Sequence, residues 1–199
     1  MSELLVDPVV SRAKFDRELA LYREIQDSYV RQGWWLIKAE FPEVFVVFAS
    51  SRAKPPVVVF GVLLDFENYD LWPPSVRLVD PFTRVPYKAN ELPVQLVRRM
   101  PTQGTNEPTG QTNTQAQPQL QVIAQSHGPE DIPFLCIPGV REYHQHPAHS
   151  GDSWLTHRGK GEGTLHFLLE RLYSYGVQSV RVQVQVQFGL IHELRSVAQ

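Results

Sequence analysis

Three short runs rich in Val, Phe, Ile and Trp constrain the fold of this chain more than any other feature. They cover residues 34–41, 44–50 and 57–66, and the breaks between them contain Pro42-Glu43 and the pair Pro55-Pro56. Runs of this length and composition are typical of β-strands, and breaks this short join neighbouring strands in antiparallel order. The sequence therefore predicts an antiparallel meander at the centre of the fold.

Further elements are predicted on both sides of the meander. Residues 11–31 repeat apolar side chains every three or four positions with charged residues between them, which favours an amphipathic helix that ends at Gly33. A fourth strand at 75–79 follows a turn that contains Pro73-Pro74. Thr164 is a suitable N-cap for a leucine-striped helix ended by Gly176.

Two other segments differ from these in composition. Residues 101–121 are rich in Gln, Thr, Asn, Pro and Gly, with Glu107 as the only charge, so we expect an exposed insertion within one domain that covers residues 1–199. Valine alternates with glutamine over 180–188, which predicts a half-buried strand at a sheet edge or a partner interface. The fold class is thus α+β, one sheet with helices on its face and end.

Composition and charge exclude several classes of protein. The chain has 199 residues, 42% of them hydrophobic, which is enough for one substantial core. Its net charge is −2 without a basic half, so we expect no nucleic-acid partner. The longest apolar stretch, 55–64, is about half of the ~20 residues that a membrane span needs, and the first residues lack the features of a secretory signal. We therefore expect a cytoplasmic protein without a membrane partner.

The order of these elements, together with residues 58–78, resembles the core of ubiquitin-conjugating enzymes. In that stretch, VVFGVLLDFENYDLWPPSVRL, a strand ends in an aromatic residue and leads through a turn with Tyr69 to Pro73-Pro74 and an alternating fourth strand. Cys136 stands in the position of the family's active-site cysteine, Trp154 in that of a tryptophan, and 165–175 in that of the following helix. The resemblance covers about residues 11–176 and implies a ubiquitin-conjugating-enzyme-like fold.

The resemblance also implies an activity and partners. The cysteine would accept a ubiquitin-like modifier from an activating (adenylating) enzyme, hold it as a thioester, and pass it to an amine or hydroxyl of a protein substrate. Such a transferase needs no cofactor of its own. The resemblance further implies that the helix face with Arg12, Arg17 and Arg23 receives the activating enzyme, whereas a solvated charged face is the ordinary alternative.

The chain departs from that family in three features, one of which is that the Val/Gln strand replaces the family's usual C-terminal helices. Family members carry His-Pro-Asn about ten residues before the cysteine, whereas this chain reads His127-Gly128-Pro129 and has no asparagine there to stabilise an oxyanion. The loop at 138–154 is also richer in histidine than in eukaryotic members. It resembles divergent bacterial relatives from operons that encode a ubiquitin-like protein, an activating enzyme and a metalloprotease, which are linked to phage defence.

Cys136 is the only cysteine and the predicted nucleophile. A thiolate both attacks a thioester and leaves readily when an amine attacks its own acyl group. Because proline and glycine end a strand, Ile137-Pro138-Gly139 would turn the thiol out of the core. The alternative is a buried structural cysteine.

Histidines that follow the cysteine are its predicted support. His144, His146 and His149 would transfer protons or stabilise charge beside the thiol, so the predicted catalytic residues are Cys136 and these three histidines, with no metal. Two alternatives stay open for the loop that reaches to His157. It could hold zinc with Asp152, Glu142 or water as the fourth ligand, or its rings could bond to backbone carbonyls. An inactive relative that binds its partner through the final strand or the insertion is the competing hypothesis.

Overall fold

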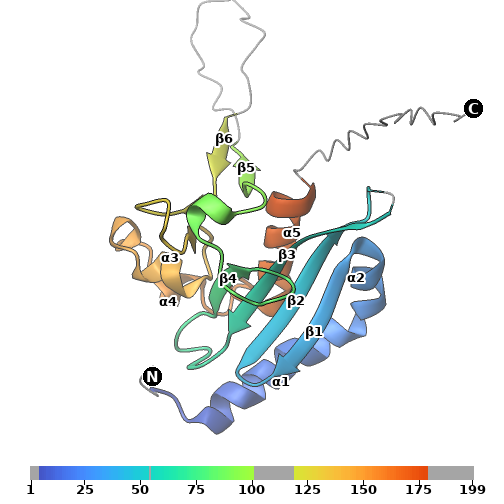
Figure 1. The fold of residues 1–199 in the computed structure, drawn as a ribbon. Helices are drawn as coiled ribbons and strands as arrows, with labels where there is room; N and C mark the ends of the chain where they lie inside the picture. The colour runs from blue at the N-terminus through green and yellow to red at the C-terminus, as the bar shows by residue number, and fades with distance from the viewer. Residues whose placement is uncertain (1–4, 54, 101–118, 179–199) are drawn as a thin grey trace, which may run out of the picture.

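A four-stranded antiparallel sheet in the order β1-β2-β3-β4 forms the centre of the protein (Figure 1). The structure is a computed structural model, and it describes residues 5–53, 55–100 and 119–178. The sheet confirms the predicted meander and its fourth strand. Its strands are β1 (Trp34–Glu40), β2 (Glu43–Ser50), β3 (Val57–Asp65) and β4 (Ser75–Val79).

Two helices stand where the sequence predicts one over residues 11–31. They are α1 (Pro8–Glu24) and α2 (Gln26–Gln32), and they are separated by Ile25, whose φ of −120° is not helical. Gly33 ends α2 as predicted, with a φ of +93°. A Cβ at this position would lie 2.2 Å from the carbonyl oxygen of Ala49, so the close approach of α2 to β2 requires glycine.

The second predicted helix is confirmed as α5 (Leu165–Tyr173). Thr164 caps it, because its hydroxyl accepts a hydrogen bond from the backbone N–H of Phe167 at 3.3 Å. The predicted leucine stripe is buried along its whole length, and comprises Leu165, Leu168, Leu169 and Leu172. The chain does not end its helix at Gly176 but continues as a π-helical turn, Ser174–Gln178.

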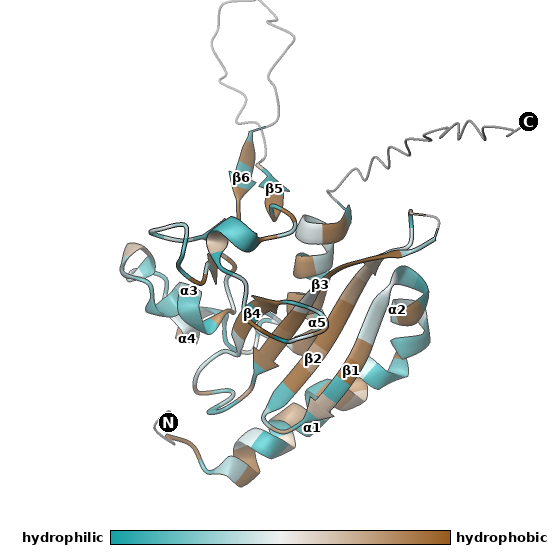
Figure 2. Cartoon of the chain, viewed as in Figure 1, coloured by the Kyte–Doolittle hydropathy of each residue, from teal (hydrophilic) through white to brown (hydrophobic). Residues whose placement is uncertain are grey.

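Alternate residues of β2 face two different layers. Val44, Val46 and Phe48 belong to the main core, together with Phe15 of α1 and Leu168 of α5, so both helices cover one face of the sheet (Figure 1). On the opposite face Phe45 and Val47 form a smaller cluster. Because both faces of β2 are covered, this strand and β3 are continuously hydrophobic, as Figure 2 shows.

The second half of the chain builds smaller elements beside the sheet. A hairpin pairs β5 (Val97–Arg99) with β6 (Leu120–Val122), and β7 (Ala124–Gln125) pairs with β8 (Phe134–Leu135). The predicted insertion at 101–121 therefore extends too far, because Leu120 and Gln121 pair with β5. Residues 101–118 and the predicted strand at 180–188 lie outside the described residues. The remaining elements are two 3₁₀ turns, Ala89–Glu91 and Pro147–His149, and the short helices α3 (Arg141–Gln145) and α4 (Trp154–His157).

Glu18 of α1 joins three parts of the fold. Its carboxylate is 4% exposed and accepts hydrogen bonds from the Tyr69 hydroxyl and from the backbone N–H of Leu165, both at 3.3 Å. Leu165 is the first residue of α5, so a side chain of α1 satisfies a free N–H of that helix. The turn around Tyr69 packs against the core, since this residue is buried.

Among the described residues, no helix is long and apolar enough to cross a membrane.

Candidate functional site

Cys136 lies directly after β8 and is fixed by a ladder of backbone hydrogen bonds. Its N–H donates to the carbonyl of Ile123 at 2.8 Å, and the N–H of Ile123 donates to the carbonyl of Leu96 at 2.8 Å. Cys136 is 5% exposed, so Pro138-Gly139 does not turn the thiol out of the core as the sequence suggests. The reason is that the ladder holds this short strand against the hairpin, with the side chain directed into the main core cluster.

His149 is the predicted histidine that lies beside the cysteine. The Cys136 Sγ and the His149 Nε2 are 3.6 Å apart, within the reach of a sulfur hydrogen bond. The imidazole is stacked on the ring of Tyr143, with centroids 4.1 Å apart and an interplanar angle of 27°. This pair has the geometry of a nucleophile and its base, in which a third group orients the base.

The resting state of the thiol follows from its surroundings. Burial raises the pKa of Cys136, and the positive charge of Arg98 on β5 opposes that rise. At neutral pH the sulfur is therefore mostly protonated, and it becomes a nucleophile by giving its proton to a nearby base.

His144 has a different role from His149. Its Nε2 accepts a hydrogen bond from the N–H of Gly139 at 3.0 Å, and its Nδ1 donates to the carbonyl of Asp152 at 2.8 Å. Burial lowers the pKa of this imidazole, which keeps it neutral with the proton on Nδ1. Both ring nitrogens are thus used to tie the turn after the cysteine to the following loop.

His146 lies in a stack of three rings. Its centroid is 4.4 Å from that of Phe134 and 5.6 Å from that of His127, which the sequence places at the family's oxyanion motif. Its Nδ1 accepts a hydrogen bond from the N–H of Ala148 at 3.2 Å. Its Nε2 is buried and has no hydrogen-bond partner among the described residues.

Asp152 is the centre of a polar network that the sequence does not predict as a unit. Its Oδ2 accepts a hydrogen bond from the Tyr143 hydroxyl at 2.6 Å, and its Oδ1 lies 2.5 Å from the Nε2 of His157. The Nδ1 of His157 lies 2.6 Å from a carboxylate oxygen of Glu162. The network links α3, α4 and the approach to α5, and through Tyr143 it reaches the ring that supports His149.

The structure shows no ligand set for the zinc alternative within the described residues. Within residues 5–53, 55–100 and 119–178, no group of three or more His, Cys, Asp or Glu side chains is placed to hold a metal ion. His144 already uses both ring nitrogens. Hydrogen bonding to backbone groups describes His144, and His149 lies within hydrogen-bonding distance of the thiol.

The paired His157 predicts a pH dependence of stability. The hydrogen bonds to Asp152 and Glu162 raise the pKa of His157 above its usual 6.5. The interactions of protonated His157 with the two carboxylates therefore stabilise the fold fully below pH 6.5. This stabilisation is lost as the pH rises through the raised pKa of His157. We expect His157→Gln to cost about 1.5–3 kcal/mol at pH 5.5 and clearly less at pH 9, measured by urea unfolding.

His127→Gln is the control for this experiment, because that histidine is exposed and forms no hydrogen bond or ion pair within the described residues. It should stay within about 0.5 kcal/mol of the original protein at both pH values. Equal costs of His157→Gln at pH 5.5 and pH 9 would contradict the assignment of a protonated His157 between two carboxylates.

Contacts of α3 hold the cysteine loop against the sheet. Arg141 donates from Nε to the carbonyl of Pro73 at 3.1 Å and from Nη2 to that of Glu67 at 2.5 Å. The next residue, Glu142, accepts hydrogen bonds from the hydroxyl of Ser75 and from the N–H of Val76. The turn before β4 is thus bound to the helix that follows Cys136. Trp154 is buried, and its indole N–H donates to the carbonyl of Asp70 at 3.2 Å.

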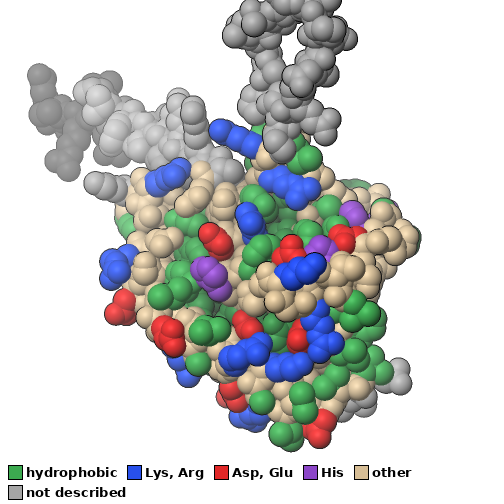
Figure 3. Space-filling view, turned by 180° about the vertical axis from the view of Figure 1, so that it is seen from behind, with side chains coloured by type: hydrophobic (Ala, Val, Ile, Leu, Met, Phe, Trp, Pro, Cys, Tyr) green, Lys and Arg blue, Asp and Glu red, His purple; other side chains and the backbone are tan. Residues whose placement is uncertain are grey.

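The face of α1 carries charges of both signs. Figure 3 shows Lys and Arg side chains next to Asp and Glu on the helical side of the molecule. Arg12 lies 4.0 Å from Asp16, and Arg17 lies 3.2 Å from Glu18. Two of the three arginines that the sequence singles out therefore have acidic neighbours on their own helix, which is what a solvated helix face also shows.

Comparison with known proteins gives a family. Residues 6–180 match the model of the Y4jH-like family, described as the Y4jH family. The chain is 47% identical over 188 residues, 92% of each of the two chains, to a protein of Sinorhizobium fredii (strain NBRC 101917 / NGR234) named uncharacterized protein y4jH. The matched region includes the sheet, Cys136 and the histidine-rich loop. The chain belongs to the Y4jH-like family.

Proposed function

We propose that this protein is a ubiquitin-conjugating-like enzyme that carries a ubiquitin-like modifier as a thioester on Cys136. The observation that carries the proposal is the 3.6 Å separation of the Cys136 Sγ and the His149 Nε2, at the start of the loop that follows β8. A lone cysteine beside an oriented histidine is the arrangement that acyl transfer through sulfur needs.

The order of elements supports the same proposal. A helix, a meander of β1 to β4, the turn from Tyr69 to Pro74, the cysteine loop and α5 follow one another as they do in the ubiquitin-conjugating enzymes that the sequence resembles. By that resemblance the protein would work in the cytoplasm with an activating enzyme, and its conjugation would serve defence against phage.

The proposed reaction has two transfers. His149 takes the proton of Cys136, and the thiolate attacks the carbonyl carbon of the thioester that joins the modifier to the activating enzyme. A new carbon–sulfur bond forms, and the thiolate of the activating enzyme leaves. In the second transfer an amine or hydroxyl of the target attacks the new thioester and gives up its proton to solvent, the Cys136 thiolate leaves, and it recovers a proton from His149.

The proposal requires access to a sulfur that is 5% exposed at the residue level. The 3₁₀ turn Pro147–His149 lies beside the sulfur through His149, and its residues Pro147 and Ala148 are exposed. An extended C-terminal segment of a modifier would have to displace part of this turn before its carbonyl reaches the thiol. Because His149 belongs to this turn, the arrival of the acyl donor would also affect how His149 removes the proton from the thiol.

The test is formation of an adduct. The protein is mixed with ATP, a ubiquitin-like protein and an activating enzyme that adenylates it, and a gel without reductant is run. We expect an adduct that thiol reductant removes and that Cys136→Ala abolishes. His149→Gln should slow its formation about 100-fold, since a positioned base contributes roughly 10²–10⁴. His166→Gln on α5 should leave the rate unchanged.

Two results would contradict this function. One is the absence of any adduct, and the other is an adduct that persists in Cys136→Ala or resists reductant.

An inactive binding module of the same fold is the second candidate, and the burial of Cys136 is the observation that favours it. A buried thiol with a raised pKa is a poor nucleophile unless a base acts on it. The module would bind the modifier without an adduct, and Cys136→Ala would bind it equally well. The experiment above therefore separates the two functions.

A further inference from the structure

Residues 144–152, which we call the histidine segment, contact the thiol through His149. Every residue of this segment is exposed or half-buried, and the nearest buried residues are Tyr143 before it and Trp154 after it. Segments with few buried apolar contacts open locally at a low cost in free energy. The histidine segment is therefore held in place by its hydrogen bonds and ring contacts rather than by an apolar core.

Asp152 closes the histidine segment. Its backbone N–H donates to the carbonyl of His149 at 2.9 Å, and its own carbonyl accepts a hydrogen bond from the Nδ1 of His144 at 2.8 Å. Its Oδ2 accepts from the hydroxyl of Tyr143 at 2.6 Å, and the ring of Tyr143 stacks on the imidazole of His149. These contacts join the end of the segment to its beginning, in the conformation that places His149 at the Cys136 sulfur.

His157 joins Asp152 to the rest of the fold. Its Nε2 lies 2.5 Å from the Oδ1 of Asp152, and its Nδ1 lies 2.6 Å from a carboxylate oxygen of Glu162. The side chain of His157 is only 17% exposed. The other titratable group that faces it is His144, with ring centroids 5.2 Å apart, while Arg158 directs its charge to the turn before β4.

The charge of His157 determines how firmly Asp152 is held. An imidazolium has two N–H donors, one for each carboxylate, whereas a neutral imidazole has a single donor and turns a lone pair toward the second carboxylate. The hydrogen bonds to Asp152 and Glu162 raise the pKa of His157 above 6.5, so the charged form prevails in weak acid. As the pH rises through the raised value, the contact that closes the histidine segment weakens.

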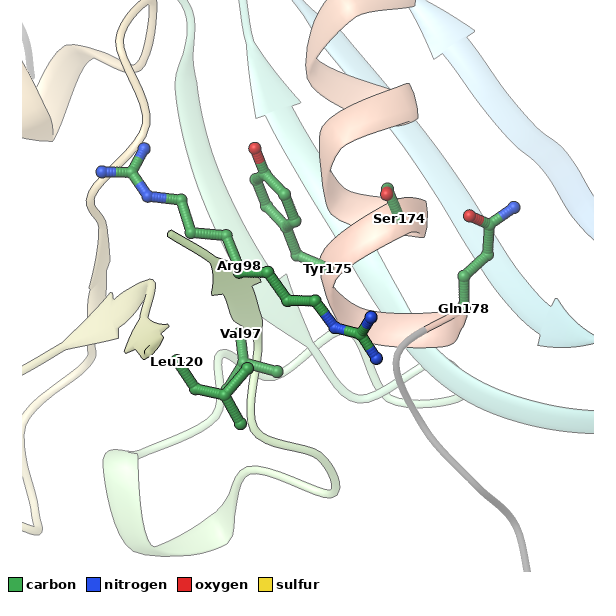
Figure 4. Close-up of a pocket in the computed structure, with 7 residues that line it drawn as sticks. Val97, Arg98, Leu120, Ser174, Tyr175 and Gln178 are labelled. Carbon is green, nitrogen blue, oxygen red and sulfur yellow. The ribbon is translucent and has the colours of Figure 1, made fainter. Parts of the chain in front are cut away.

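The thiol lies away from the open pockets of this fold. Figure 4 shows one of them, of about 500 Å³, between the β5–β6 hairpin and the turn Ser174–Gln178, and its lining does not include Cys136 or His149 among the described residues. Two others, of about 540 and 430 Å³, lie against the sheet and between α1 and β1. Since Cys136 is 5% exposed, a reactant needs a movement of neighbouring residues to reach its sulfur.

We propose that the charge of His157 controls access to Cys136, because the charged imidazole holds the histidine segment closed beside the thiol and the neutral imidazole lets the segment open. This control of access stands apart from the proposed function. Its consequence, that loading of Cys136 with a ubiquitin-like modifier is held back in weak acid, rests on that function.

The experiment measures how fast 4,4′-dithiodipyridine labels the full-length protein at pH 5.5 and pH 9. The Cys136 thiolate attacks one sulfur of the reagent, a mixed disulfide forms, and the reagent's own S–S bond breaks. The other half leaves as 4-thiopyridone, which takes up the proton lost by the thiol and is followed by its absorbance. The rate of each variant is divided by that of the unaltered protein at the same pH, which cancels the ionisation of the thiol.

Two variants remove the contacts of the charged imidazole. His157→Gln should label about tenfold faster at pH 5.5, since it loses hydrogen bonds between charged groups, and should stay within about twofold of the unaltered protein at pH 9. Glu162→Gln leaves Asp152 intact and neutralises only the second carboxylate. It should label about threefold faster at pH 5.5, because a neutral acceptor bonds a cation more weakly than a carboxylate does.

Two control variants separate this effect from others. His127→Gln removes an exposed histidine outside the network and should leave the rate unchanged at both pH values. Asp7→Ala removes the N-cap of α1, whose side chain accepts from the N–H of Val9 at 2.9 Å, and lowers the stability of the whole fold. Its labelling rate should also stay unchanged if the thiol is reached by local opening.

Four outcomes would overturn the proposal. They are an unchanged rate in His157→Gln at pH 5.5, the same acceleration of this variant at both pH values, an equal acceleration in Asp7→Ala, and absence of labelling of the unaltered protein at pH 9. Labelling needs neither a modifier nor an activating enzyme. Failure of the thioester assay with the expected labelling would remove the proposed function and leave the control of access, and a normal adduct with equal labelling of all variants would do the reverse.

Discussion

Replacing Gly139 with alanine should destabilise the protein by about 2–5 kcal/mol. Gly139 has a φ of +89°, which costs an L-residue about 1–2 kcal/mol. A Cβ there would also lie 2.3 Å from the backbone nitrogen of Gly163, and inserting a methyl into packed structure costs about 1–3 kcal/mol. Urea unfolding measures the loss. The rate of Cys136 alkylation should rise as well, because Gly139 anchors the turn that follows the cysteine through its bond to His144.

Gly159 supplies a matched control for that substitution. It has a φ of +78°, but a Cβ there would meet nothing within 4 Å. Gly159→Ala should therefore cost only the backbone term of about 1–2 kcal/mol. If both variants lose the same stability, the contact between the two glycine-containing turns is not what holds the cysteine loop.

The second large effect is expected at Glu18. Glu18→Ala leaves the Tyr69 hydroxyl and the N–H of Leu165 buried without an acceptor, at about 1–3 kcal/mol for each group. Burial and the nearby Glu18 raise the pKa of Tyr69, so its hydroxyl stays protonated and depends on this acceptor. We expect a total loss of about 2–6 kcal/mol and a melting temperature lower by about 2–4 °C for each kcal/mol lost, measured by calorimetry.

Glu18→Gln tests the origin of the effect, since an amide oxygen can still accept one of the two hydrogen bonds. It should recover roughly half of the loss. Glu24→Ala, an exposed position of α1, should stay within about 0.5 kcal/mol of the original protein. A loss at Glu18→Ala no larger than at Glu24→Ala would show that the carboxylate does not hold α5.

Local patterns account for what the sequence predicted well. The four strands and the cap at Thr164 depend on residues a few positions apart, and β4 was predicted with its exact bounds. The apolar spacing continues through Ile25, so it does not predict the non-helical backbone dihedral angles that separate α1 from α2 there. The boundary at 121 was missed because two short strands, β5 and β6, pair across 20 or more residues.

The candidate site was predictable only in its residue types. Cys136 and His149 were named from composition and resemblance, but nothing in the spacing distinguishes His149 from His144 or His146. The distinction comes from the turn Pro147–His149, which brings one imidazole to the sulfur, and from Tyr143, which supports it. Arg98 was not found at all, since it is 38 positions from the cysteine and carries no motif.

The β5–β6 pairing extends by one further hydrogen bond, in which the N–H of Met100 donates to the carbonyl of Gln119 at 2.8 Å. The chain therefore leaves and re-enters this hairpin at one point. Since the entropy of closing a loop grows only with the logarithm of its length, segments of very different size can be accommodated here for about 0.6 kcal/mol per doubling. The length and sequence of segment 101–118 can therefore vary among relatives while the backbone hydrogen bonds that position Cys136 are kept.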